Sequence, residues 1–232
     1  MLTGLRLGGV EPLEIVAGAR GEWAERASLD AFLTEPGRFW EYFFPRAREI
    51  ADRAPTAGHA AIARLQRVGA ITALITQAVD RLHMKAGSPD VVEVYGHVLI
   101  VRCERCGERY GLSEAGVLIV ASADGVPRCT SEACSFPLRP EGTLWGEPLP
   151  QQAVTRAWEL AAQADLFVIV DSSLRTAPIS LLPSVPLTRR MPLVVIGRVP
   201  TQYDRYAVQV IRHPSGPLLE ALADLVGPPA ER

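Results

Sequence analysis

The sequence predicts an α/β fold in which a doubly wound parallel sheet carries a small zinc-binding insert. Three observations predict it. Short, continuously apolar strand segments alternate with helical segments, which is typical of a parallel sheet covered by helices on both faces. Four cysteines lie in two close pairs. A chain of 232 residues can bury one sizeable core together with a small module.

The amino-terminal third is expected to be mainly helical. Residues 28–53 carry large apolar side chains at helical spacing, and Pro36-Gly37 breaks this stretch into two helices. A further helix is expected over residues 58–66. The apolar run that follows, residues 70–76, is short enough for a buried parallel strand. The sequence begins inside the expected first strand, which is either abbreviated or preceded by further residues.

The rest of the chain continues this alternation. Expected strands cover residues 91–101, 117–121, 166–170 and 193–196, and expected helices cover residues 153–164 and 218–226. We assign residues 1–90 and 150–232 to a large domain built on the parallel sheet, and residues 91–149 to a small zinc-binding module. Ligands of such sheets bind beyond the carboxyl ends of the strands, so the loops after residues 4, 76 and 170 matter most.

Composition and charge narrow the class of protein. The formal net charge of −2 lacks the basic excess of a nucleic-acid-binding surface, so no nucleic-acid partner is expected. No stretch reaches the roughly 20 apolar residues of a membrane-spanning helix. The first residues lack a basic start followed by an apolar run, so a secretory signal is not expected either. A cytoplasmic location follows by default.

The four cysteines predict a metal site. Cys103 and Cys106 are separated by two residues, and Cys129 and Cys134 by four. Each pair can aim two thiolates at one ion, and four thiolates complete a tetrahedral zinc site without an open position for water, so the zinc would be structural. The alternative is four buried cysteines acting as small hydrophobes, which the charged residues and glycines nearby disfavour. A redox or catalytic role is weaker still.

Several motifs resemble the sirtuin family, in the right order along almost the whole chain. Residues 76–88 resemble the family's TQNxDxLHxxAG stretch, and residues 92–96 resemble its ELHG segment, which leads into the first cysteine pair. Residues 138–140 and 145–150 resemble the segments that follow the second pair. The chain is identified as a divergent member, similar to bacterial NAD-dependent protein deacylases. The resemblance implies a Rossmann-like large domain and a small zinc domain, with NAD and an acyl-lysine peptide meeting between them.

Two residues depart from the family at positions that the resemblance makes catalytic. Tyr95 stands where the family has the histidine that acts as general base on the ribose hydroxyl. A tyrosine, whose ordinary pKa is about 10, titrates too high for that role. Ala78 stands where the family has an asparagine that helps to position the nicotinamide ribose and water. Both are expected to be non-functional. His97, potentially on the same strand face as Tyr95, would lie about 6–7 Å further along.

The cofactor positions are partly retained. The resemblance assigns cofactor contacts to Gly4, Gln77, Asp80 and Ser173. The bulky segment at residues 5–7, however, obstructs the turn where backbone N–H groups should approach the phosphates. Asp171 replaces the glycine of the family's GTS turn. It either faces the cofactor, whose phosphates its charge would repel, or faces away as a turn or cap residue. NAD binding is therefore doubtful on the sequence alone.

The sequence favours a sirtuin-fold protein that has lost NAD-dependent protein-lysine deacylase activity and acts by binding a partner. Trp145, Gly146 and Glu147 would form one wall of the remaining cleft, where the family takes its peptide as an added strand through main-chain groups. A protein or peptide partner is therefore expected. The alternative is a divergent but active NAD-dependent protein deacylase or ADP-ribosyltransferase that uses Tyr95 or His97. An enzyme acting on a different nucleotide or small molecule is a third possibility, but the sequence contains no motif that indicates it.

Overall fold

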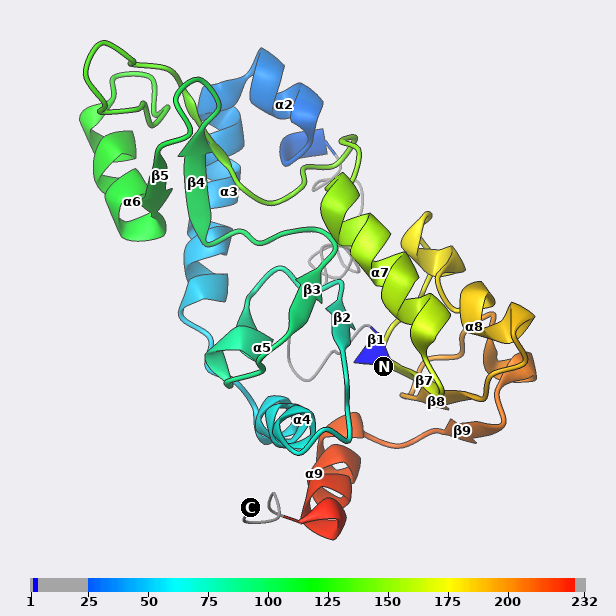
Figure 1. The fold of residues 1–232 in the computed structure, drawn as a ribbon. Coiled ribbons are helices and arrows are strands. Elements are labelled where there is room, and N and C mark those ends of the chain that lie inside the picture. Colours follow the sequence, from blue (N-terminus) through cyan, green and yellow to red (C-terminus); the bar gives the residue numbers. More distant parts are fainter. Residues whose placement is uncertain (1, 4–24, 228–232) are drawn as a thin grey trace. The chain divides into compact units, whose positions relative to one another are not determined.

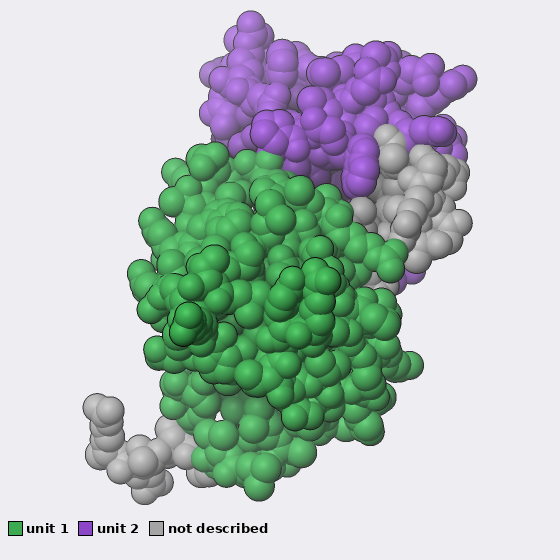
Figure 2. Space-filling view, turned by 90° about the vertical axis from the view of Figure 1, so that its right-hand side faces the viewer, with its two compact units in different colours: residues 1–9, 54–94, 149–232 green, residues 10–53, 95–148 purple. Residues whose placement is uncertain are grey.

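The computed structural model describes residues 2–3 and 25–227, which fall into two compact units. Unit 1 contains residues 2–3, 54–94 and 149–227, and unit 2 contains residues 25–53 and 95–148. Figure 2 shows the two units in different colours. The chain therefore crosses between the units several times.

Unit 1 is built on a six-stranded sheet in the order β3-β2-β1-β7-β8-β9 (Figure 1). The strands are β1 (Leu2–Thr3), β2 (Leu74–Thr76), β3 (Val91–Glu93), β7 (Phe167–Val170), β8 (Leu193–Ile196) and β9 (Gln209–Ile211). Every neighbouring pair is parallel. The strand order reverses at β1, whose neighbours are β2 and β7, and this confirms the predicted doubly wound sheet. Sheets of this kind bind ligands at the point of reversal.

The core of unit 1 follows from its continuously apolar strands. Helices α4 (Ala57–Arg67) and α9 (Ser215–Val226) pack together against the sheet. Their shared core includes Ile62, Leu65, Leu74, Val170, Ile196 and Leu219. Full burial of each such side chain contributes about 1.5–3 kcal/mol relative to exposure. The unit is completed by α5 (Leu82–Lys85), α7 (Gln151–Gln163), α8 (Ser184–Thr188), and the turns η1 (Ile179–Leu181) and η2 (Asp204–Tyr206).

Unit 2 combines a small antiparallel sheet with helices. The sheet has the order β5 (Arg109–Gly111), β4 (Ile100–Cys103), β6 (Leu138–Pro140), and the helices are α2 (Leu29–Thr34), α3 (Pro36–Ala51) and α6 (Leu112–Ala121). The sequence predicts that α2 and α3 belong to the sheet domain, but they group with the cysteine module. The reason is close helix packing. A Cβ added at Gly116 of α6 would lie 2.7 Å from the ring of Phe44 in α3.

The predicted strand over residues 117–121 is wrong, because these residues form the second half of α6. The helix begins after Gly111, whose N–H donates to Glu114 Oε2 at 2.8 Å. A side chain in the first turn that accepts the backbone N–H of the residue before the helix is typical of a helix start. The apolar run itself carried no decisive period, and a short apolar segment of that kind fits a strand or a buried helix equally well.

The predicted strand over residues 91–101 is split into two. Strand β3 ends at Glu93, and β4 begins at Ile100 in the other unit. The break falls at Gly96, which has a positive φ of 65° that side chains rarely tolerate. The six residues 94–99, with Gly96 among them, therefore separate the strand of the parallel sheet from the strand of the antiparallel one.

None of the helices within residues 25–227 is long and apolar enough to cross a membrane.

Candidate functional site

The residues that the sequence singles out fall in both units. Gln77, Ala78, Asp80 and Ser173 belong to unit 1, whereas Tyr95, Trp145 to Glu147 and the four cysteines belong to unit 2. Gly4 and the segment at residues 5–7 lie outside the described residues.

In unit 1 a hydrogen bond joins the loops after β2 and β7. Ser172 Oγ donates to Gln77 Oε1 at 2.6 Å, and both side chains are buried. The sequence points to Gln77 but not to Ser172, whose only signal is its place between Asp171 and Ser173. Since β2 and β7 flank β1, this bond places polar groups at the carboxyl ends of the strands where the sheet reverses.

The loop after β2 is fixed by its own side chains. Thr76 Oγ1 accepts the N–H of Ala78 at 3.0 Å, and Asp80 Oδ1 accepts the N–H of Leu82 at 2.9 Å, where α5 begins. Ala78 and Asp80 are both buried. The methyl group of Ala78 has no hydrogen-bonding capacity, so this position shapes the turn without offering a polar contact.

Asp171 contacts the start of α9. Its backbone has a left-handed φ of 46°, a conformation that aspartate tolerates better than most side chains. Its Oδ2 accepts a hydrogen bond from Ser215 Oγ. A Cβ added at Gly197 would lie 2.7 Å from Asp171 Oδ1, so the carboxylate fills the space that a side chain at residue 197 would need. A negative charge at a helix N-terminus is favourable by about 0.3–1 kcal/mol. Asp171 thus anchors α9.

In unit 2, Tyr95 lies beside the segment that follows β6 and precedes Trp145. The carbonyl of Tyr95 accepts the N–H of Thr143 at 2.9 Å. A Cβ added at Gly142 would lie 2.8 Å from the carbonyl oxygen of His97, so these two segments are in direct contact. His97 is buried, with Nε2 3.9 Å from Glu141 Oε2. Because the chain turns at Gly96, Tyr95 and His97 do not share a strand face, which corrects the arrangement expected from the sequence.

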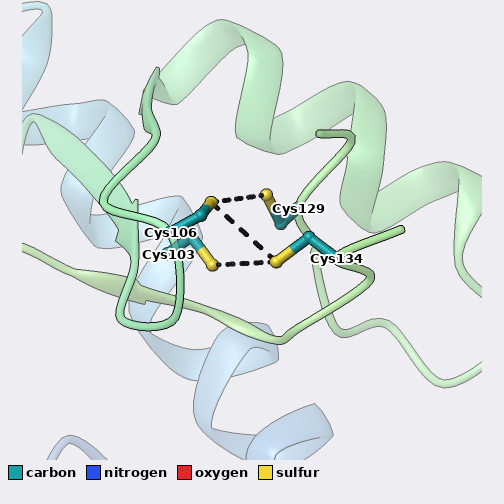
Figure 3. Close-up of side chains that lie close together, drawn as sticks. All are labelled: Cys103, Cys106, Cys129 and Cys134. Atoms are coloured by element: carbon teal, nitrogen blue, oxygen red, sulfur yellow. Dashed lines mark hydrogen bonds between the residues drawn. The ribbon is translucent and has the colours of Figure 1, made fainter. Parts of the chain in front are cut away.

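The four cysteine sulfurs of unit 2 converge (Figure 3). All four lie within 4.8 Å of one another. Cys103 Sγ is 3.5 Å from Cys134 Sγ, and Cys106 Sγ is 3.5 Å from Cys129 Sγ. Zinc–sulfur bonds of about 2.3 Å imply sulfur–sulfur edges of about 3.8 Å in a tetrahedron. The cluster therefore has the donor set and dimensions of a closed zinc site. The wider second pair is accommodated by left-handed backbone at Ala133 and Ser135.

Unit 1 also contains a buried pair of imidazoles, His59 and His83, whose ring centroids lie 4.7 Å apart. His59 Nδ1 accepts the N–H of Thr56 at 3.2 Å at the start of α4. Burial, together with the neighbouring His59, lowers the pKa of His83 to about 3. Burial also lowers the pKa of His59, while Asp80 acts in the opposite direction. Both rings are therefore neutral at neutral pH.

We expect this pair to make the protein acid-sensitive. An imidazole whose pKa is lower when folded than unfolded contributes its full stability above the unfolded pKa of about 6.5. That contribution is lost as the pH falls from about 6.5 toward the folded value. For His83 the loss should reach about 2 kcal/mol by pH 5. Urea unfolding at pH 8, 6.5 and 5 measures it.

In wild type, unfolding between pH 6.5 and 5 should be accompanied by the uptake of a proton at His83. His83→Leu should therefore lower the number of protons taken up on unfolding by about one, which is measured as a shallower slope of the unfolding free energy against pH. His213→Gln, which removes an exposed imidazole outside the pair, should keep the wild-type slope. An identical slope in wild type and His83→Leu would contradict this account of the pair.

Comparison with known proteins identifies the family. A family profile described as the Sir2 family matches residues 21–178. This protein is a member of the Sir2 family. NAD-dependent protein deacetylase 1 of Pyrobaculum aerophilum is 34% identical to it over 96% of this chain and 87% of that protein. NAD-dependent protein deacetylase 1 of Geobacillus kaustophilus is 38% identical over 83% and 76%.

Solved Sir2 structures share the fold. Sir2Tm bound to a propionylated peptide matches with a TM-score of 0.82 and 27% identity, covering 97% of this chain and 92% of that chain. A Sir2 mutant in which tyrosine replaces a histidine, in complex with a p53 peptide and NAD, matches with a TM-score of 0.81 and 29% identity over the same shares.

These relatives overturn the interpretation of this Sir2 protein as a sirtuin without activity, and with it the doubt about NAD. Proteins 31–38% identical over most of this chain are named NAD-dependent protein deacetylases or deacylases. Tyr95 in place of the family's histidine does not by itself exclude activity, for a physical reason. A general base contributes about 10²–10⁴-fold, whereas enzymes accelerate reactions by about 10⁶–10¹⁷-fold, so a poorer base slows a reaction without abolishing it.

Proposed function

We propose that this Sir2 protein is an NAD-dependent protein-lysine deacylase. The observation that carries the proposal is its likeness to relatives of that name, at 34% identity over 96% of this chain and 87% of the Pyrobaculum protein. A match of this extent includes both the parallel sheet and the cysteine module.

In unit 1, the polar loops at the reversal of the sheet support a site for NAD. The bond from Ser172 to Gln77 holds these loops together at the carboxyl ends of β7 and β2. Asp171 accepts a hydrogen bond from Ser215 Oγ, so the negative charge of its carboxylate is partly compensated by the N-terminus of α9. NAD, when bound, supplies a glycosidic bond whose cleavage releases nicotinamide. The loops of unit 1 would orient the dinucleotide and exclude water around that bond.

In unit 2, we assign the proton-accepting position to Tyr95. Its main chain is tied to Thr143, and the residue is half-buried, with its phenol oxygen buried. Only the phenolate form of tyrosine can act as a base, and this form is scarce at neutral pH because the ordinary pKa of the phenol is about 10. A Sir2 mutant with tyrosine in place of a histidine was solved with NAD and a p53 peptide, so that protein holds both ligands. We therefore expect a slow enzyme.

We assign a structural zinc ion to the cysteines. Four thiolates leave no coordination position for water or substrate, so the metal would hold the module together without taking part in the reaction.

The proposal is tested by incubating the protein with NAD and a panel of acetylated and propionylated lysine peptides. Loss of the acyl group should match nicotinamide release one for one. An unacylated peptide should give neither product. Nicotinamide release without loss of the acyl group would argue for glycohydrolase or ADP-ribosyltransferase chemistry, and absence of both at millimolar NAD would reject the proposal.

A further inference from the structure

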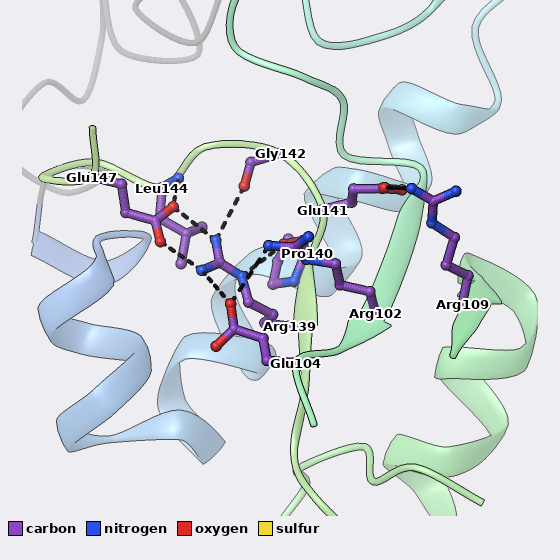
Figure 4. A network of polar contacts seen from close by, with 9 residues as sticks. All are labelled: Arg102, Glu104, Arg109, Arg139, Pro140, Glu141, Gly142, Leu144 and Glu147. Atoms are coloured by element: carbon purple, nitrogen blue, oxygen red, sulfur yellow. Dashed lines mark hydrogen bonds and ion pairs between the residues drawn. The ribbon is translucent and has the colours of Figure 1, made fainter. Parts of the chain in front are cut away.

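Unit 2 contains a bidentate ion pair between Arg139 in β6 and Glu147 (Figure 4). The arginine Nη1 lies 2.5 Å from Glu147 Oε1, and Nη2 lies 2.7 Å from Oε2. The side chains are only 8% and 13% exposed. A bidentate, buried pair of this kind fixes both groups in one orientation.

The same carboxylate also closes a turn. Glu147 Oε2 accepts the N–H of Leu144 at 2.7 Å, and the N–H of Glu147 donates to the carbonyl of Leu144 at 3.1 Å. Leu144 is buried, so both ends of the turn are anchored. The two residues between them, Trp145 and Gly146, are exposed. The turn therefore presents a two-residue tip on a rigid base.

A third contact fixes the tip from the side. The carbonyl of Trp145 accepts the N–H of Leu29 at 2.9 Å, at the start of α2. Ser28 caps that helix by accepting the N–H of Ala31 at 3.0 Å. The backbone at Trp145 is thus held by α2, while its side chain is 48% exposed. An exposed tryptophan on a rigid support is the kind of residue that dominates protein–peptide interfaces.

The charges of the pair are mutually maintained. Burial alone would raise the pKa of Glu147, but the hydrogen bonds from Arg139 and Leu144 bring it below its usual range. Burial would lower the pKa of Arg139, and Glu147 and Glu104 raise it instead. Arg139 also donates to the carbonyls of Pro140 and Gly142, which joins the turn to β6. The pair consequently remains ionised, and the turn remains closed, across the neutral range.

We propose that Arg139 and Glu147 are positioning residues that hold the Trp145-Gly146 tip in the conformation that binds an acylated peptide. The inference rests on the proposed deacylase function, because the peptide is that enzyme's substrate. Neither residue needs to touch the reacting atoms. The pair acts through the backbone of the tip, so its loss should weaken peptide binding and leave NAD binding unchanged.

The test uses the variant Arg139→Met/Glu147→Leu in the full-length, zinc-loaded protein. Removing one partner alone leaves a buried charge uncompensated, so Arg139→Met should lower the melting temperature, whereas the double variant should regain much of it.

Affinity for an acetylated peptide should nevertheless fall by about tenfold or more in the double variant. Amide exchange at Leu144 should accelerate, because its acceptor is gone. A role in stability alone would predict recovery of binding along with recovery of the melting temperature.

The matched control is Arg109→Gln, which removes an exposed arginine of the same sheet that pairs with Glu141. Its peptide affinity should stay within about twofold of wild type. A folded double variant with wild-type peptide affinity, or with unchanged exchange at Leu144, would reject the positioning role of the pair. It would leave the proposed deacylase function standing. Wild-type protein that binds no acylated peptide would reject the proposed function, and this inference with it.

Discussion

Removal of zinc is expected to unfold unit 2 while unit 1 keeps its parallel sheet. Structural zinc sites contribute about 10–16 kcal/mol at pH 7 in zinc-finger peptides, which is comparable to the total stability of about 5–15 kcal/mol of a typical domain. The four cysteines join the end of β4 and the turn after it, which hold Cys103 and Cys106, to the loop that holds Cys129 and Cys134. Chelation followed by hydrogen exchange, read separately for residues 100–140 and 167–211, measures the effect. Elemental analysis of untreated protein should give about one zinc per chain.

The variant Cys129→Ser should reproduce the effect of chelation, since it removes one ligand of the site. Ser131→Ala is the matched control, because Ser131 lies beside the cluster, 3.9 Å from Cys106 Sγ, without supplying a thiolate. It should keep its zinc. Full exchange protection in the metal-free protein, or an iron–sulfur chromophore in the untreated protein, would contradict a structural zinc site.

The substitution Tyr95→His is expected to raise kcat for deacylation by about 10²–10⁴-fold, the usual contribution of a well-placed general base. Histidine titrates near neutral pH, whereas a tyrosine with its ordinary pKa of about 10 is almost wholly protonated there. The backbone at this position is held by Thr143, so the smaller imidazole should be presented by the same turn. Steady-state kinetics with an acetylated peptide measures the change.

A pH profile makes the assignment specific. Activity of Tyr95→His should fall below a pKa near 6.5, where imidazole becomes protonated, whereas wild-type activity should keep rising toward alkaline pH. Tyr206→His places a histidine at an exposed tyrosine of unit 1 and should leave both kcat and the profile as in wild type. An unchanged kcat for Tyr95→His would show that Tyr95 does not occupy the proton-accepting position.

Much of this protein could be predicted from its sequence because the relevant patterns are local. The strands that became β2, β7 and β8 are short apolar runs, and such runs are buried wherever a sheet forms. The two cysteine pairs predict a metal site, because thiolates separated by two to four residues can converge on one ion. The family motifs identified the Sir2 fold. The same motifs misled on activity, because a list of substituted residues does not measure how much rate each one contributes.

The hydrogen-bond partners, the side-chain directions and the grouping of helices depend on contacts between segments that are distant in the sequence. Only the tertiary structure determined these features. It brought Ser172 to Gln77 across 95 residues of sequence, directed the carboxylate of Asp171 to Ser215, and grouped α2 and α3 with the cysteine module. Within a much shorter stretch of sequence, it also joined Arg139, Leu144 and Glu147 into one network. A side chain's direction is set by whichever partners the folded chain places around it, and buried polar groups take the hydrogen bonds available there. No local pattern encodes those partners, so these features could be found only in the folded chain.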